Sequence, residues 1–129
     1  MNILDENIPG NQRQLLKSWR VRVRQIGYDV SRKGIKDDEI IPFLIGQRQP
    51  TFFTRDFGFY DRKLCHTDYC LVFLDIRRDE VATFVRRLLR HPQFNTKAKR
   101  LGRVLRVSQI GLHLWKLHAE EEIAVSWDG

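Results

Sequence analysis

Short apolar runs alternate with segments of helical periodicity along the whole chain, and few folds satisfy such an alternation. The clearest run is Cys70–Leu74, five consecutive apolar residues that end at Asp75. Strands that are buried on both faces of a parallel sheet have uninterrupted apolar sequences of this kind. Because strands that alternate with helices indicate βαβ units, we expect an α/β fold with helices on the faces of a mainly parallel sheet centred on this run.

The other elements are predicted from the same two periodicities. Helical spacing is clearest over residues 80–91, where Val81, Phe84, Val85 and Leu88 share one side and arginines take the other. Further helices are expected over 10–17 and 37–45, and strands over 2–4, 21–23, 51–54, 104–107, 112–115 and 123–127. The last three strands make the C-terminal part of the fold rich in β-structure.

Two segments lack a clear signature. Residues 95–100 are basic and show no apolar periodicity, so we expect a loop there. Pro42 lies inside the helix expected over 37–45, where it removes a backbone donor and favours a bend.

The chain has 129 residues, the usual size of one domain, so we expect a single domain over residues 1–129. No apolar run approaches the roughly 20 residues that span a bilayer, which argues against a membrane protein. Asp5 and Glu6 lie where a secretory signal has basic residues, so we expect a cytoplasmic protein. Cys65 and Cys70 fit neither a disulfide scaffold nor a four-ligand zinc site and are expected to be reduced thiols.

Positive charge is concentrated in one part of the chain. Residues 77–106 hold ten Lys or Arg and two acids, whereas the net charge of the whole chain is +7. A concentrated positive region attracts polyanions, and contacts of Lys and Arg with phosphate supply most of the sequence-independent affinity for nucleic acid. The charge therefore favours nucleic-acid binding, although an arginine-rich helix face can also be ordinary solvated surface.

Acidic residues stand at strand ends and at a helix start. Asp5 follows the first expected strand, Asp56 follows the strand over 51–54, and Asp37 opens the helix over 37–45. In open parallel sheets the functional crevice lies at the carboxyl ends of the strands, where these side chains can converge. Crowded carboxylates need a hard cation to neutralise them, which indicates Mg2+ or Mn2+. The alternative is structural, because an Asp after a strand often caps the next helix and an acid in a first turn offsets the helix dipole.

Three segments resemble a known family: Leu4–Pro9, Asp37–Ile40 and Phe53–Phe59. They are similar to the PIN-like proteins of the VapC toxin type, in the branch with a Leu-Asp-Glu-Asn-Leu-Pro-like strand end and a Thr-x-Asp-x-Asp-Phe-like turn. The similarity runs in order over residues 2–75. It implies a PIN-like three-layer α/β/α fold, Mg2+- or Mn2+-dependent cleavage of RNA and a cognate antitoxin protein as partner, and it allows a homodimer.

Carried over one position at a time, the resemblance implies that Asp5, Asp37 and Asp56 bind the metal and are catalytic. The second Asp of the family's turn falls on Gly58, and Asp61 is the candidate to replace this missing metal ligand. The candidate outer-shell or substitute ligands are Glu6, Asn7, Asp38 and Thr54. Of these, Thr54 and Asn7 are expected to orient the carboxylates by hydrogen bonds. The candidate RNA-binding residues, which could guide the phosphate backbone toward the acids, are Arg86, Arg87, Arg90, Lys97, Lys99 and Arg100.

Three functions are compatible with these residues. The first is a metal-dependent endoribonuclease, the toxin of a type II toxin-antitoxin pair, in which water is the nucleophile and no side chain is covalently modified. The second is a non-enzymatic PIN-like module, weakened by Gly58, that binds a protein partner or nucleic acid. The third is a small-molecule phosphatase or a nuclease of another doubly wound family, which the basic surface favours less. Dependence on a divalent metal separates the first function from the second.

Overall fold

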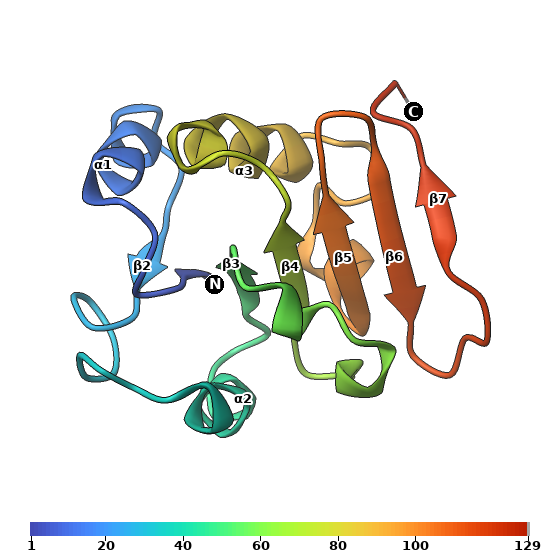
Figure 1. Ribbon diagram of the computed structural model, residues 1–129, viewed down its shortest axis with the longest axis horizontal. Coiled ribbons are helices and arrows are strands. Elements are labelled where there is room, and N and C mark those ends of the chain that lie inside the picture. Colours follow the sequence, from blue (N-terminus) through green and yellow to red (C-terminus); the bar gives the residue numbers. More distant parts are fainter. Residues whose placement is uncertain (129) are drawn as a thin grey trace.

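Seven strands form one sheet in the computed structural model, which describes residues 1–128 (Figure 1). The strands are β1 (Asn2–Leu4), β2 (Arg24–Gln25), β3 (Thr51–Thr54), β4 (Cys70–Leu74), β5 (Arg103–Val107), β6 (Leu112–Lys116) and β7 (Ile123–Val125). Their order across the sheet is β2-β1-β3-β4-β5-β6-β7. The first five strands in this order are parallel, and β6 and β7 are antiparallel to their neighbours. The expected α/β fold with a mainly parallel sheet is confirmed, and β4 is its middle strand as predicted.

Helices connect the strands. The α-helices within residues 1–128 are α1 (Gly10–Ser18), α2 (Asp37–Ile45), α3 (Val81–Leu89) and α4 (Lys97–Arg100). Three 3-10 helices accompany them, η1 (Phe57–Phe59), η2 (Arg62–Leu64) and η3 (Arg78–Glu80). Among these residues no helix has both the length and the apolar character needed to cross a membrane.

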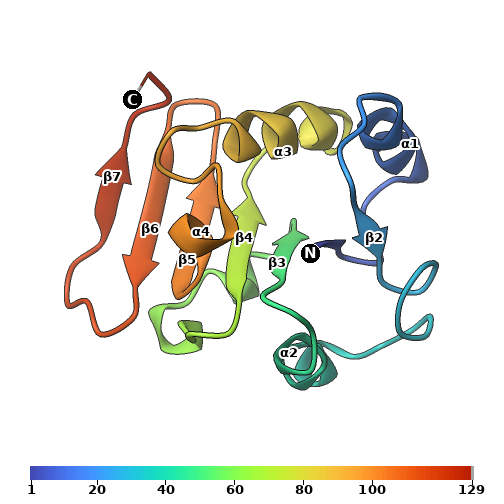
Figure 2. The ribbon, with the colours of Figure 1, turned by 180° about the vertical axis from the view of Figure 1, so that it is seen from behind.

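The sheet separates two hydrophobic cores. Phe53 and Val72 belong to the core that α1 and α3 cover, whereas Phe52 and Leu71 belong to the core that α2 covers. Because successive residues of a strand point to opposite faces, each fully apolar central strand contributes to both cores. Figures 1 and 2 show α1 and α3 along one side of the strands and α2 on the other side.

The strand predicted over residues 21–23 forms farther along the chain, as β2. The chain leaves α1 through Arg20, which has a positive φ of 62°. The N–H of Val21 still bonds back to the carbonyl of Leu16, so pairing with β1 begins only at Arg24.

The loop expected over residues 95–100 contains the short helix α4, so this prediction was wrong in part. The Thr96 hydroxyl caps α4 by accepting a hydrogen bond of 3.2 Å from the N–H of Lys99. The helix expected over residues 37–45 is present as α2, and it continues past Pro42 to Ile45.

The direction in which strands are added reverses between β1 and β3. From β1 the chain passes through α1 to β2 at the edge of the sheet, and after α2 it returns to β3 on the opposite side of β1. In open α/β sheets such a reversal leaves a crevice at the carboxyl ends of the two strands, where ligands bind. The candidate acids are found at this place.

Candidate functional site

Thr54 connects two of the candidate acids. Asp5 follows β1 and Asp56 follows β3, and these strands are parallel neighbours, so both residues lie at one edge of the sheet. The hydroxyl of Thr54 donates to a carboxylate oxygen of Asp5 at 2.7 Å and accepts from the N–H of Asp56 at 3.0 Å. Because Thr54 is fully buried, its hydroxyl is a fixed point between the two acids. The hydrogen bond predicted for Thr54 is therefore present.

The Asp56 side chain begins η1. One of its carboxylate oxygens accepts a hydrogen bond of 2.9 Å from the N–H of Gly58, and the side chain is otherwise exposed. This capping fits the structural alternative for an Asp after a strand. It uses one carboxylate oxygen and leaves the other without a capping role.

Asp37 is the first residue of α2 and completes the group. Although the residue is exposed, partial burial of its carboxyl is the largest cause that raises its pKa, followed by the charge of Asp56 and a side-chain hydrogen bond with Asp56. For Asp5, burial raises the pKa most, the hydrogen bond from Thr54 opposes it, and the charges of Asp37 and Asp56 raise it further. Three acids from three separate elements therefore act on one another electrostatically.

A pocket of about 310 Å3 opens beside this group. It is lined by Asp37, Asp38, Ile41, Asp56, Gly58, Phe59 and Leu64. Two of these lining residues bear on the ligands predicted from the sequence. Asp38 lines the pocket, and so does Gly58, where a Cβ atom would lie 3.2 Å from a carboxylate oxygen of Asp56.

The donor set suits a hard cation, because carboxylate oxygens are the ligands that Mg2+ and Mn2+ prefer. Within residues 1–128, however, no group of three or more His, Cys, Asp or Glu side chains is already placed to hold a metal ion. Asp37 and Asp56 form the close pair, and Asp5 interacts with both.

Glu6 has a structural role instead of the expected ligand role. Its carboxylate accepts two hydrogen bonds, of 2.9 and 3.0 Å, from the N–H of Gly34. It also packs on Gly27, where a Cβ atom would come within 2.8 Å of a carboxylate oxygen of Glu6. Asn7 is exposed, and within residues 1–128 its side chain makes none of the hydrogen bonds expected of it.

Asp61 is not brought to the group. Its side chain caps η2 by accepting a hydrogen bond of 2.9 Å from the N–H of Lys63. Its charge raises the pKa of Cys65, and it is not among the charges that shift Asp5 or Asp37. The arrangement offers no support for Asp61 as the substitute for an acid at position 58.

Sequence reasoning missed Gln25, which fixes the segment that carries Asp5. The Gln25 side chain is fully buried and donates to the carbonyl oxygens of Asp5, Glu6 and Ile8 at 3.1, 3.2 and 2.8 Å. The available signal was the position of Gln25. It lies two residues after Val23, on the side of the chain that the alternation of valines and arginines predicts to be buried.

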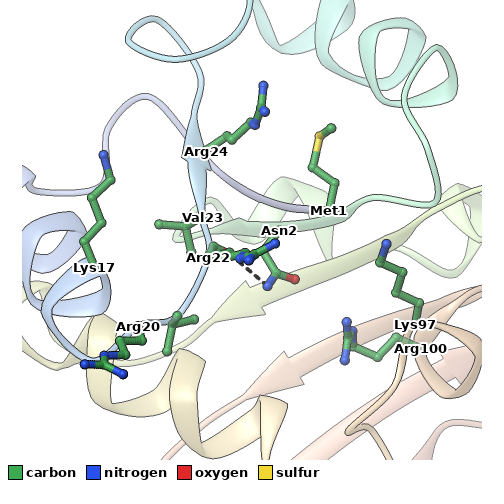
Figure 3. Close-up of a pocket in the computed structure, with 10 residues that line it drawn as sticks. Met1, Asn2, Lys17, Arg20, Arg22, Val23, Arg24, Lys97 and Arg100 are labelled. Atoms are coloured by element: carbon green, nitrogen blue, oxygen red, sulfur yellow. Dashed lines mark hydrogen bonds between the residues drawn. The ribbon is translucent and has the colours of Figure 1, made fainter.

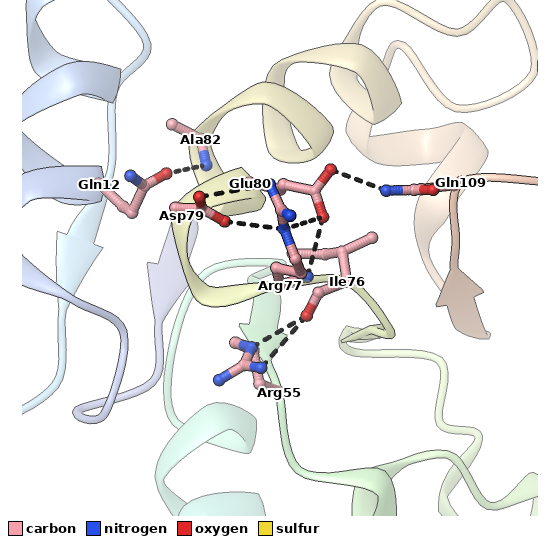
Figure 4. A network of polar contacts seen from close by, with 8 residues as sticks. All are labelled: Gln12, Arg55, Ile76, Arg77, Asp79, Glu80, Ala82 and Gln109. Atoms are coloured by element: carbon pink, nitrogen blue, oxygen red, sulfur yellow. Dashed lines mark hydrogen bonds and ion pairs between the residues drawn. The ribbon is translucent and has the colours of Figure 1, made fainter.

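Three arginines at the same edge were also missed. Arg55 donates to the carbonyl of Ile76 at 3.2 and 3.3 Å, and Arg77 pairs with acids of η3 (Figure 4). Arg55, Arg77 and Arg78 line a common pocket of about 550 Å3. Their positions directly after β3 and β4 could have indicated that they lie at the edge that carries the acids.

The predicted RNA-binding residues lie elsewhere. Because α3 connects two parallel strands, it runs back from the acidic edge, and α4 lies just before β5 begins. Arg86 lies over the ring of Trp19 at 3.7 Å and Arg87 over the ring of Trp127 at 4.4 Å, whereas Arg90 is exposed.

The basic residues around α4 differ in exposure. Lys97 is exposed, and Lys99 donates to the carbonyl of Pro92 and to the side chain of Asn95. Arg100 is only 5% exposed and holds buried polar groups of the core, so its prediction as a free phosphate-binding side chain was wrong.

Comparison with protein-family models, with characterised proteins and with solved structures found no match to this chain.

Proposed function

We propose that the protein is a metal-dependent endoribonuclease of the PIN-like, VapC-toxin type, the toxin of a type II toxin-antitoxin pair. The observation that carries this proposal is the meeting of Asp5, Asp37 and Asp56 at the reversal of strand order. Burial and the charges of Asp37 and Asp56 raise the pKa of Asp5, and burial and the charge of Asp56 raise the pKa of Asp37. Carboxylates crowded in this way are costly unless a cation neutralises them. The position is also where open α/β sheets bind their ligands.

The residues of the site have separable tasks in this proposal. Asp5, Asp37 and Asp56 would hold Mg2+ or Mn2+, and Thr54 would fix the orientation of the Asp5 carboxylate. Bound there, such an ion lowers the pKa of a ligated water and stabilises charge on a phosphodiester. The nucleophile is water, and no side chain becomes covalently attached to the substrate.

The arginines at the acidic edge suit the phosphates of an RNA substrate. Arg77 and Arg78 are exposed, and Arg55 lies next to Asp56 in the sequence. Guanidinium groups bind phosphate oxygens in a forked geometry without reading base sequence. Arg55, Arg77 and Arg78 are therefore better placed than the arginines of α3 to position a phosphodiester near the aspartates.

The direct experiment measures cleavage of a fluorescent RNA by purified protein with Mg2+, with Mn2+ and with EDTA. We expect cleavage only with a metal, and a loss of at least about a hundredfold in Asp5→Asn, since a metal ligand is removed. Asp61→Asn removes an exposed carboxylate outside the group and should retain activity. Cleavage that is unchanged in Asp5→Asn, or that persists in EDTA, would contradict the proposal. In cells, the same Asp5→Asn substitution should relieve growth arrest.

A second candidate is favoured by one observation. Residues 1–128 contain no ready-made group of three metal ligands, and Gly58 occupies the place where the family has an acid. A PIN-like module that binds a protein partner or nucleic acid without cleavage would have these properties. In the experiment above, this module would cleave the RNA neither with a metal nor with EDTA.

A further inference from the structure

A second concave surface lies at the opposite edge of the sheet from the aspartates, because it lies at the start of β1 and Asp5 follows the end of this strand. It is a pocket of about 740 Å3 beside Asn2 and Arg24 (Figure 3). Its exposed cationic residues come from α1, from the segment that leads into β2 and from α4. We name it the basic groove, and these residues are Lys17, Arg20, Arg22, Arg24 and Lys97. No acidic residue of the described chain lines it.

The arginines form a row because the chain alternates here. Arg22 and Arg24 are exposed, whereas Val23 between them is buried and packs into the core. In extended chain, residues two positions apart are separated by about 6.6 Å on the same face. β2 is the outermost strand, so the row lies at the border of the sheet.

The positive charge of the groove is not neutralised within the protein. Other cations of the chain have acidic partners, such as Arg106, whose guanidinium lies 2.8 Å from Asp75. The five residues of the basic groove form none of the ion pairs found among residues 1–128. Unpaired cations from three elements that share one concave surface favour an external polyanion.

We propose that the basic groove binds the phosphodiester backbone of a single-stranded nucleic acid, at a site separate from the aspartates and independent of the proposed nuclease activity. A volume of about 740 Å3 exceeds the need of one phosphate, and the cations are distributed along it. A single strand carries a charge on every nucleotide and can follow a concave surface, whereas a duplex is a stiff rod. Val21, which is half-buried, supplies apolar surface beside the cations.

The test measures binding of a fluorescently labelled oligouridylate in EDTA by anisotropy, over a range of salt concentrations. In Arg22→Gln/Arg24→Gln, two exposed phosphate contacts are removed without altering a buried residue. Each phosphate contact to a single strand contributes about 0.7 to the slope of log affinity against log salt, so the slope should become shallower by about 1.4, and affinity at low salt should fall roughly tenfold. The control is Lys63→Gln/Lys116→Gln, which removes the same charge at exposed positions outside the groove and should change neither value.

Two further measurements identify the class of ligand and distinguish binding in the basic groove from binding at the aspartates. Asp5→Asn should bind the oligouridylate as the wild-type protein does, whether or not the protein is a nuclease. Poly-glutamate and inorganic phosphate should compete weakly. No binding by the wild-type protein, an equal loss in the lysine control, or equal competition by poly-glutamate would each overturn the proposal, the last in favour of an acidic protein partner.

Discussion

Uncharged side chains decide where the acids of the candidate site lie. The Thr54 hydroxyl donates a hydrogen bond to Asp5 and accepts one from the N–H of Asp56. The Gln25 side chain donates hydrogen bonds to three carbonyl groups of the segment that follows β1. Both side chains are buried, so their hydrogen bonds are costly to break. The aspartates are thereby held near one another in spite of their mutual repulsion.

This repulsion predicts how stability depends on pH. The pKa of Asp5 is raised above its ordinary value of 3.8, first by burial and also by Asp37 and Asp56. Between pH 3.8 and the raised pKa, the folded state binds more protons than the unfolded state, so stability decreases as pH rises through this interval. Asp5→Asn removes the titrating charge and can still accept the hydrogen bond from Thr54.

In EDTA we expect Asp5→Asn to be more stable than the wild-type protein at neutral pH, with a difference that shrinks toward pH 3.8. Urea unfolding of both proteins at several pH values measures this difference. A wild-type protein that is the more stable of the two at neutral pH, or a difference that does not vary with pH, would disprove the assignment of the raised pKa to Asp5.

At the scale of secondary structure, the elements predicted best are those whose own sequence determines them. The apolar run of β4 and the helical spacing of α3 identify these elements without tertiary information. α4 was missed because its four residues have no apolar periodicity and depend on long-range contacts. β2 was misplaced because its start depends on how the chain leaves α1.

The candidate site was predictable to the same degree. Asp5 and Asp56 could be placed together because the carboxyl ends of parallel strands share an edge. The edge at which a basic residue lies depends on the direction of its helix, and this is why the arginines of α3 and α4 were wrongly directed at the acids. Gln25 was missed because its only signal was a place in the buried phase two positions after Val23, and the three carbonyl groups that it binds are set by the tertiary fold.

Arg100 provides a prediction about α4. Its guanidinium donates to the Thr51 hydroxyl at 2.9 Å and to the Phe94 carbonyl at 2.7 Å, so it ties α4 to β3 and to the preceding turn. Arg100→Gln should lower the free energy of unfolding by about 2–3 kcal/mol, because buried partners lose their hydrogen bonds. Lys97→Gln, in the same helix but exposed, should change it by less than about 0.5 kcal/mol. Urea denaturation compares them, and equal small losses would argue against a structural role for Arg100.

On the scale of the whole molecule, the two edges of the sheet carry different groups. The carboxyl edge gathers Asp5, Asp37 and Asp56 with Arg55, Arg77 and Arg78 nearby, whereas the amino edge carries the basic groove, which no acidic residue of the described chain lines. In our proposals the carboxyl edge would bind a metal ion and a substrate phosphate, and the groove would bind a nucleic-acid backbone without metal.

Calorimetric titration of the protein with Mn2+ tests most directly whether the three aspartates form a metal site. We expect one bound ion, with affinity weakened at least about tenfold in each of Asp5→Asn, Asp37→Asn and Asp56→Asn, and unchanged in Asp61→Asn. Absence of Mn2+ binding, or an equal loss of affinity in Asp61→Asn, would contradict a metal site at the reversal of strand order.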